Sequence, residues 1–196
     1  MSFDTSEIPQ SAGSYMKLKG GENRFRILAS LVEGYVYWQE VDGKKSPVRK
    51  TAENPIDLRE QVEKKIKFFW AFPVWNYAES AIQVMELTQK TIMREIQNLA
   101  KDEDWGDPKK YDIVVVKMGE DKETRYSVMP KPAKDLSEEA TEAWNEIKEG
   151  FNLQNLFDNQ SPFPQKAEDG KKKEPEQVDE DEEEKEEEIN IDDIPF

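Results

Sequence analysis

The stretch KFFWAFPVWNY, residues 67–77, decides how the rest of the chain is interpreted. Its run of aromatic and other apolar residues predicts a long β-strand. Successive side chains of a strand point to opposite faces, so the even and odd positions are considered separately. The even positions from 66 to 74 are all apolar and predict a face buried in the core. The odd positions mix rings with a lysine and small residues, which predicts an exposed aromatic face unless every ring in the stretch is buried.

The neighbouring segments predict a mainly β fold with helices. Strands are expected at residues 24–29, 35–39, 66–77, 82–87, 111–118 and 124–129, with a hairpin loop at 119–122. Ile92, Ile96 and Leu99 form an apolar stripe that predicts a helix over 88–101, and a shorter helix is expected from Asn54 to Lys65. A helix before the final hairpin is typical of the OB-fold, a five- to six-stranded Greek-key β-barrel, although another α+β sheet gives a similar order.

Composition changes along the chain and predicts four regions. The chain has 43 acidic and 28 basic residues and a net charge of −15. Residues 167–196 hold 15 of the acids and only four of the bases. We expect a flexible arm at 1–14, the OB-fold domain at 15–134, a helix and a short apolar segment at 135–159, and a disordered acidic tail at 160–196. The apolar part of the third region, residues 151–157, indicates docking or self-association.

Several function classes are excluded or disfavoured by what the sequence lacks. Without cysteine or histidine it has no disulfide, no thiol nucleophile, no Ser/His/Asp triad and no ordinary zinc site. The acids at 102, 103, 104 and 107 match no calcium loop and are better explained as the turn that ends a helix. We therefore expect no enzyme, metal or cofactor. No apolar run approaches the roughly 18 residues of a membrane span, and no signal peptide is apparent, which predicts a cytoplasmic protein.

Cations and rings alternate with apolar residues in the other strands as well. Arg24 and Arg26 share one face of the first strand, and Tyr35 and Tyr37 share one face of the second. Interleaved cations and rings suit single-stranded nucleic acid, because cations follow the phosphates and rings stack on the bases. The basic segment 44–50 is interpreted as a loop that contacts phosphate, with an ordinary solvated loop as the alternative. The predicted DNA-binding residues are Arg24, Arg26, Tyr35, Tyr37, Lys44, Lys45, Arg49, Lys50, Lys64, Lys65, Lys67, Phe69, Trp75 and Tyr77.

The acidic region finishes in the apolar stretch INIDDIPF, residues 189–196. A rigid proline, a phenylalanine ring and a terminal carboxylate suit a pocket with a basic rim on a partner protein. The acidic stretch before them would act as a tether. The predicted partner-binding residues are Asp192, Asp193, Ile194, Pro195 and Phe196.

These segments resemble two groups of single-stranded DNA-binding proteins. DDIPF (192–196) is similar to the C-terminal tip of the bacterial proteins, which recruits replication and repair enzymes. KGGENRFRIL (19–28), FWAFPVWNY (69–77), WGDP (105–108), YDI (111–113) and NLQNLF (152–157) resemble the proteins of tailed bacteriophages. The resemblance implies an OB-fold core that coats single-stranded DNA in replication and recombination in the infected bacterial cell. It also implies recruitment of a polymerase, helicase, primase or nuclease. The Cys/His zinc site of some phage proteins cannot exist here.

The sequence thus predicts a non-enzymatic single-stranded DNA-binding protein. The alternative is an acidic protein–protein adaptor or DNA mimic without intrinsic nucleic-acid binding. A carboxylate-dependent nuclease would need a clustered acidic site that the sequence does not offer. The face assignment predicts that Trp75→Ala weakens DNA binding, whereas Trp70→Ala mainly destabilises the fold.

Overall fold

Seven antiparallel strands form one sheet in the computed structural model, which describes residues 13–41, 43–53, 57, 59 and 63–164. The strands are β1 (Gly21–Ile27), β2 (Val32–Val41), β3 (Lys44–Thr51), β4 (Lys67–Asn76), β5 (Ala81–Leu87), β6 (Ile113–Met118) and β7 (Arg125–Pro130). The helices with fully described bounds are α2 (Lys90–Lys101) and α3 (Glu138–Ile147), with short 3-10 turns at η1 (Pro108–Lys110), η2 (Asp121–Glu123) and η3 (Leu153–Asp158). The predicted mainly β class with few helices is confirmed.

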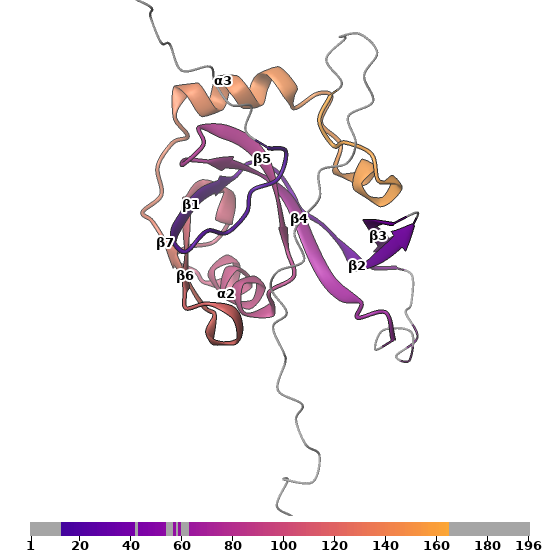
Figure 1. The fold of residues 1–196 in the computed structure, drawn as a ribbon. Helices are drawn as coiled ribbons and strands as arrows, with labels where there is room; N and C mark the ends of the chain where they lie inside the picture. Colours follow the sequence, from indigo (N-terminus) through magenta and orange to yellow (C-terminus); the bar gives the residue numbers. More distant parts are fainter. Residues whose placement is uncertain (1–12, 42, 54–56, 58, 60–62, 165–196) are drawn as a thin grey trace, which may run out of the picture.

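The strands lie in the order β3-β2-β4-β1-β6-β7, and β5 pairs with β4. The path through the described strands ends at β3 and β7, so their ladders form an open sheet and not the closed barrel expected from the sequence. In Figure 1, β4 runs from the part of the molecule that holds β1, β6 and α2 to the part that holds β2 and β3. This central strand therefore links two regions with different surroundings.

One edge of β4 pairs with two successive strands. β2 pairs with residues 67–71 and β1 with residues 74–76, while β5 occupies the other edge. Pro73 lies between the two ladders, where its carbonyl accepts a hydrogen bond of 3.0 Å from the Leu28 N–H. Proline cannot donate to a ladder, so a central strand tolerates it only at such a gap. Pro73 is thus compatible with a strand that is paired on both edges.

The main core lies between the sheet and α2. Phe25 and Ile27 of β1 contact Phe72 and Val74 of β4 and the apolar side of the helix. Ile92 and Ile96 are buried there, and Leu99 is half-buried, so the predicted amphipathic stripe is confirmed. The even positions of β4 therefore face this core, with Phe72 and Val74 buried in it and Phe68 and Trp70 partly buried against it.

A second core lies on the opposite face of the sheet, beneath the segment of residues 138–164, which we name the C-terminal arm. Leu153 and Leu156 of this arm pack against Val36, Phe69 and Ala71. α3 contacts β5 and η3 contacts β3, and in Figure 1 the arm runs over β5 toward β3. The apolar segment 151–157 therefore docks on the sheet of its own chain.

Gly34 allows the arm to approach the sheet closely. A Cβ atom at this position would meet the carbonyl oxygen of Lys50, and it would lie 3.0 Å from the Phe157 ring. The centroids of the Phe157 and Phe69 rings are 6.0 Å apart. The missing side chain of Gly34 therefore makes room for an aromatic contact between the arm and β4.

Three parts of the chain differ from the expected elements or lie outside the described residues. The basic segment 44–50, predicted to be a loop, is strand β3, because each of its residues pairs with β2. The short helix expected from Asn54 to Lys65 falls largely outside the described residues, although Arg59 and Glu63 are helical. Residues 1–12 and 165–196, which include most of the expected arm and tail, also lie outside them. Within the described residues, no helix combines the length and apolar character needed to cross a membrane.

Candidate nucleic-acid interface

The register between β2 and β4 assigns the aromatic side chains to two faces. Tyr35 lies opposite Phe68, and Gly34 lies opposite Phe69. Directly opposed residues of an antiparallel pair share a face, and residues two apart in a strand share a face as well. Tyr35 and Tyr37 therefore share a face with Phe68 and Trp70, not with Phe69. The sequence predicted that Tyr35 and Tyr37 share one surface with Phe69. This prediction is wrong, because the ring that joins them is Phe68, one position earlier in β4.

We name Tyr35, Tyr37, Phe68 and Trp70 the aromatic patch, and all four side chains are half-buried. The Tyr35 and Phe68 rings meet edge to face with centroids 5.4 Å apart. Lys64 Nζ lies 5.0 Å and Lys50 Nζ 5.9 Å from the centroid of the Tyr37 ring. Lys50 also lies opposite Tyr35 in the β2–β3 ladder. The patch thus combines partly exposed rings with two cations at cation–π distance.

The rings expected to stack on DNA from the odd positions of β4 are buried. Phe69 has no exposed surface and Trp75 is 3% exposed. Phe69 packs under the C-terminal arm, and Trp75 lies between Arg26 of β1 and Ile82 of β5 in the ladders. The prediction that these two rings are exposed is therefore wrong. β4 is buried on both faces because each face has its own cover.

The basic residues of β3 are divided between the two faces. Lys50 points toward the aromatic patch, whereas Arg49 is 7% exposed and forms an ion pair of 2.8 Å with Glu86. Buried Arg49 thus has an acidic partner within the fold, and its predicted contact with phosphate is corrected. Lys45 is exposed, and the side chain of Lys44 lies outside the described part of the chain.

The lysines near the start of β4 are exposed, but they do not all lie on one face. Lys64 approaches Tyr37, and Lys65 is exposed in the turn before β4. Lys67 is exposed too, but it lies opposite Val36 and so belongs to the other face of the sheet. Of these three predicted lysines, Lys64 lies at cation–π distance from a ring of the patch.

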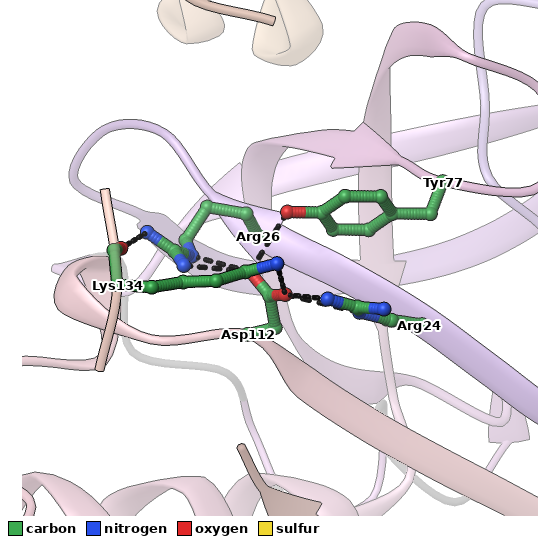
Figure 2. Close-up of polar contacts among 5 residues, drawn as sticks. All are labelled: Arg24, Arg26, Tyr77, Asp112 and Lys134. Atoms are coloured by element: carbon green, nitrogen blue, oxygen red, sulfur yellow. Dashed lines mark hydrogen bonds and ion pairs between the residues drawn. The ribbon is translucent and has the colours of Figure 1, made fainter. Parts of the chain in front are cut away.

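The remaining predicted residues meet at a carboxylate that the sequence analysis did not single out. Asp112, just before β6, has no exposed side-chain surface. Figure 2 shows the side chains of Arg24, Arg26, Tyr77 and Lys134 converging on it. We name these five residues the Asp112 cluster. The face shared by Arg24 and Arg26 is as predicted, but Arg26 is almost fully buried and is not a free surface cation.

Both oxygens of the Asp112 carboxylate are occupied. Oδ2 accepts hydrogen bonds from Nε (3.0 Å) and Nη2 (2.5 Å) of Arg24 and lies 3.6 Å from Lys134 Nζ. Oδ1 accepts hydrogen bonds from Arg26 Nε (2.7 Å) and the Tyr77 hydroxyl (2.9 Å). Arg24 also lies over the Tyr77 ring, 4.3 Å from its centroid. The cluster therefore joins β1, the turn after β4, the start of β6 and the segment that leads to α3.

The pKa values of the cluster reflect this crowding. Burial alone raises the pKa of Asp112, but hydrogen bonds from Arg24 and Tyr77 and the charge of Arg26 outweigh it and hold the pKa below its ordinary value. The hydrogen bond to the Asp112 carboxylate raises the pKa of Arg24. Burial raises the pKa of Tyr77, and its hydrogen bond to Asp112 raises it further. Asp112 is thus ionised, Arg24 is protonated and Tyr77 keeps its hydroxyl proton at neutral pH.

The acids after α2 support local turns. Asp102 accepts a hydrogen bond from the Asp104 N–H, and Asp107 accepts one from the Lys109 N–H. In the described part of the chain, no three acidic side chains gather as metal ligands would.

Comparison with known proteins adds no identity. No family model, curated protein or solved structure matches this chain. The functional assignment therefore depends on the geometry of the aromatic patch and the Asp112 cluster, together with the sequence features outside the described residues.

Proposed function

We propose that this chain is a non-enzymatic protein that binds single-stranded DNA without sequence preference. The aromatic patch carries the proposal, because its partly exposed Tyr35, Tyr37 and Phe68 rings lie beside Lys50 and Lys64. Base–aromatic stacking contributes about 1–3 kcal/mol per base and accepts any base, while cations beside the rings attract phosphate. This arrangement replaces the predicted surface that included Phe69 and Trp75.

The order of the elements supports an OB-fold as the finer description of the fold. α2 lies between β5 and the β6–β7 hairpin, the position that the OB-fold gives to its helix. The resemblance of residues 19–28 and 69–77 to phage single-stranded DNA-binding proteins points the same way. We propose that the protein coats and protects single strands during replication and recombination in the cytoplasm of an infected bacterium.

The acidic region completes the proposal, although residues 165–196 lie outside the described structure. Asp192, Asp193, Ile194, Pro195 and Phe196 would recruit a replication or repair enzyme such as a polymerase, helicase, primase or nuclease. A net charge of −15 is compatible with DNA binding because many acids are concentrated after residue 166. The local field at the binding face, and not the total charge, directs DNA.

The test is a titration of fluorescently labelled oligothymidine followed by anisotropy. We expect binding by the wild type that weakens as salt rises, and affinity about tenfold lower for Tyr37→Ala. Trp38→Ala is the matched control, because Trp38 is the next residue of β2, is also half-buried and points to the opposite face. Equal effects of the two substitutions would remove the aromatic patch from the proposal.

The acidic region also favours a second candidate, an adaptor or DNA mimic that occupies a basic groove on a partner. This candidate predicts that neither the full chain nor a chain ending at Lys166 binds oligothymidine. Our proposal predicts that both bind, with equal or higher affinity for the shorter chain because the acids no longer compete with DNA.

A further inference from the structure

The Asp112 cluster contains more positive than negative charge. Arg24, Arg26 and Lys134 surround one carboxylate, which leaves a surplus of two positive charges. Each of these three cations has Asp112 as its only acidic partner in the described part of the chain. Like charges held close together at a partly desolvated site repel one another, so a further anion would stabilise the arrangement.

The hydrogen-bonding capacity of the cluster is also unbalanced. A carboxylate has about four acceptor positions, and Asp112 already receives hydrogen bonds from Arg24, Arg26 and Tyr77. Arg26 donates from Nη1 to the Lys134 carbonyl at 3.1 Å, and its buried Nη2 lies 2.7 Å from Asp112 Oδ1 without hydrogen-bond geometry, so that oxygen is shared by Nε and Nη2 of Arg26 and by the Tyr77 hydroxyl. Buried polar groups in folded proteins are normally paired. The cluster therefore offers more donors than its own acceptors can use.

The surplus charge is open to solvent on one side. The side chain of Lys134 is 52% exposed and that of Arg24 is 38% exposed, whereas Arg26 and Asp112 are buried beneath them. A nitrogen of each exposed cation lies within 3.6 Å of Asp112 Oδ2, so one phosphate is large enough to contact both. Figure 2 shows the Tyr77 ring beside the two cations, whose terminal groups lie 4.3 and 5.8 Å from its centroid.

From this geometry we infer that the Asp112 cluster is a phosphate-binding site in which Arg24 and Lys134 contact the phosphate. Guanidinium and ammonium groups held by a buried carboxylate are pre-oriented donors, and the planar guanidinium matches phosphate geometry. The site is separate from the aromatic patch. Tyr77 follows β4 at its far end, about 30 Å from Phe68 along the strand and on the opposite face.

The phosphate has two sources that share this chemistry, the backbone of single-stranded DNA and a small phosphorylated molecule. We assign it to the DNA backbone, a step that rests on the proposed function. The test uses Lys134→Gln in the full chain, because this exposed substitution leaves Asp112 with both arginines and the Tyr77 hydroxyl. Lys131→Gln is the matched control, since Lys131 is an exposed lysine of the same segment whose side chain is outside the cluster.

In the DNA arm, affinity for oligothymidine is measured at several salt concentrations. Lys134→Gln is expected to lower the affinity about three- to tenfold and to reduce the salt slope by about 0.7, the value for one lost contact with a single strand. Lys131→Gln is expected to change both quantities much less. In the phosphate arm, inorganic phosphate is titrated into the wild type and Lys134→Gln while the backbone amide signals of Arg24, Tyr77 and Lys134 are followed by NMR. Saturable shifts are expected only in the wild type.

The combined results separate the two proposals. One set of results overturns the phosphate site and leaves the proposed function standing. In it the wild type binds DNA, Tyr37→Ala lowers the affinity, Lys134→Gln and Lys131→Gln have equal affinities, and phosphate shifts none of the NMR signals. If phosphate shifts the three signals in the wild type alone but DNA does not bind, the site stands with a small phosphorylated molecule as its source. The proposed function then fails.

Discussion

Phe68 and Phe69 are neighbours in one strand, yet their surroundings differ completely. Phe69 is fully buried under the C-terminal arm, whereas Phe68 stays partly exposed beside Tyr35. The covered face of β4, under the C-terminal arm, encloses Phe69 completely. The open face packs Phe68 only in part against the main core and leaves rings partly exposed at its edge. The difference shows that alternation in a strand defines two faces without telling which one will be covered.

The largest expected effect compares these two neighbours directly. Phe69→Ala should lower the free energy of unfolding by about 3–5 kcal/mol, because it leaves a cavity in the second core. Phe68→Ala should lower it less, since its ring is already partly hydrated, but should weaken oligothymidine binding. Urea unfolding and anisotropy titrations of both variants measure the two effects.

The same pair of variants can contradict the comparison. Similar losses of stability in both would mean that Phe68 is as deeply packed as Phe69. Trp75 is buried like Phe69, so Trp75→Ala should lower the free energy of unfolding by a similar amount. This replaces the expectation that Trp75→Ala weakens DNA binding without unfolding the domain.

A second prediction concerns the polar end of the covered face. Asp112→Asn should reduce the free energy of unfolding by about 3 kcal/mol at neutral pH, because it leaves buried Arg26 without its counter-ion. The folded-state pKa of Asp112 is lowered, so its contribution is present above the ordinary value of about 4 and is lost as the pH falls through the folded pKa. Unfolding curves of wild type and variant should therefore converge below about pH 4. A difference that does not depend on pH would refute this origin.

A third prediction tests the contact between the arm and the sheet. Gly34→Ala should destabilise the protein by about 1–3 kcal/mol, because the new Cβ meets the Lys50 backbone and the Phe157 ring. Gly20→Ala is a suitable control, since a Cβ there has no atom within 4 Å. Thermal unfolding of the two variants gives the comparison, and equal midpoints would show that β3 and the arm can both move aside without loss of stability.

The smallest effect is expected on the open face. Lys64→Gln should lower oligothymidine affinity about threefold and reduce the salt slope by about 0.7, with unchanged stability. Lys101→Gln, an exposed lysine at the end of α2, is the control for the general loss of charge. An unchanged slope would place Lys64 outside the path of the DNA.

Much of the fold could be predicted from local patterns. The long aromatic strand, the amphipathic stripe of α2 and the final hairpin all carry strong periodic signals, and each is present in the structure. β3 was missed because Lys44–Thr51 is basic and contains Pro47, which reads as a loop. Its place beside β2 explains the discrepancy, since β3 pairs only with β2 in the described sheet and such an edge strand tolerates lysine and proline.

The candidate site was predicted less well, because it depends on contacts between distant segments. The alternation of the sequence places Tyr35 and Tyr37 on one face of β2. Only the register between β2 and β4 shows that Phe68, and not Phe69, lies on that same face. Phe68 and Trp70 do pack against the main core as predicted, but they are only half-buried, and no sequence signal shows where the cover of an apolar face ends. One sequence signal could have indicated Asp112. It is an acid directly before an apolar strand, and the first strand of the same chain places two arginines on one face, where they need an acidic partner.

The C-terminal arm has a consequence for how the protein is made. During synthesis the sheet can assemble once β7 has left the ribosome. Val36, Phe69 and Ala71 remain exposed to solvent until the segment that contains Leu156 has also emerged and packed on them. A nascent chain in this interval exposes a contiguous apolar surface, the kind of intermediate that chaperones bind and that aggregates when released early. Shortened forms intended for expression should therefore extend past Phe157, however much of the acidic region they omit.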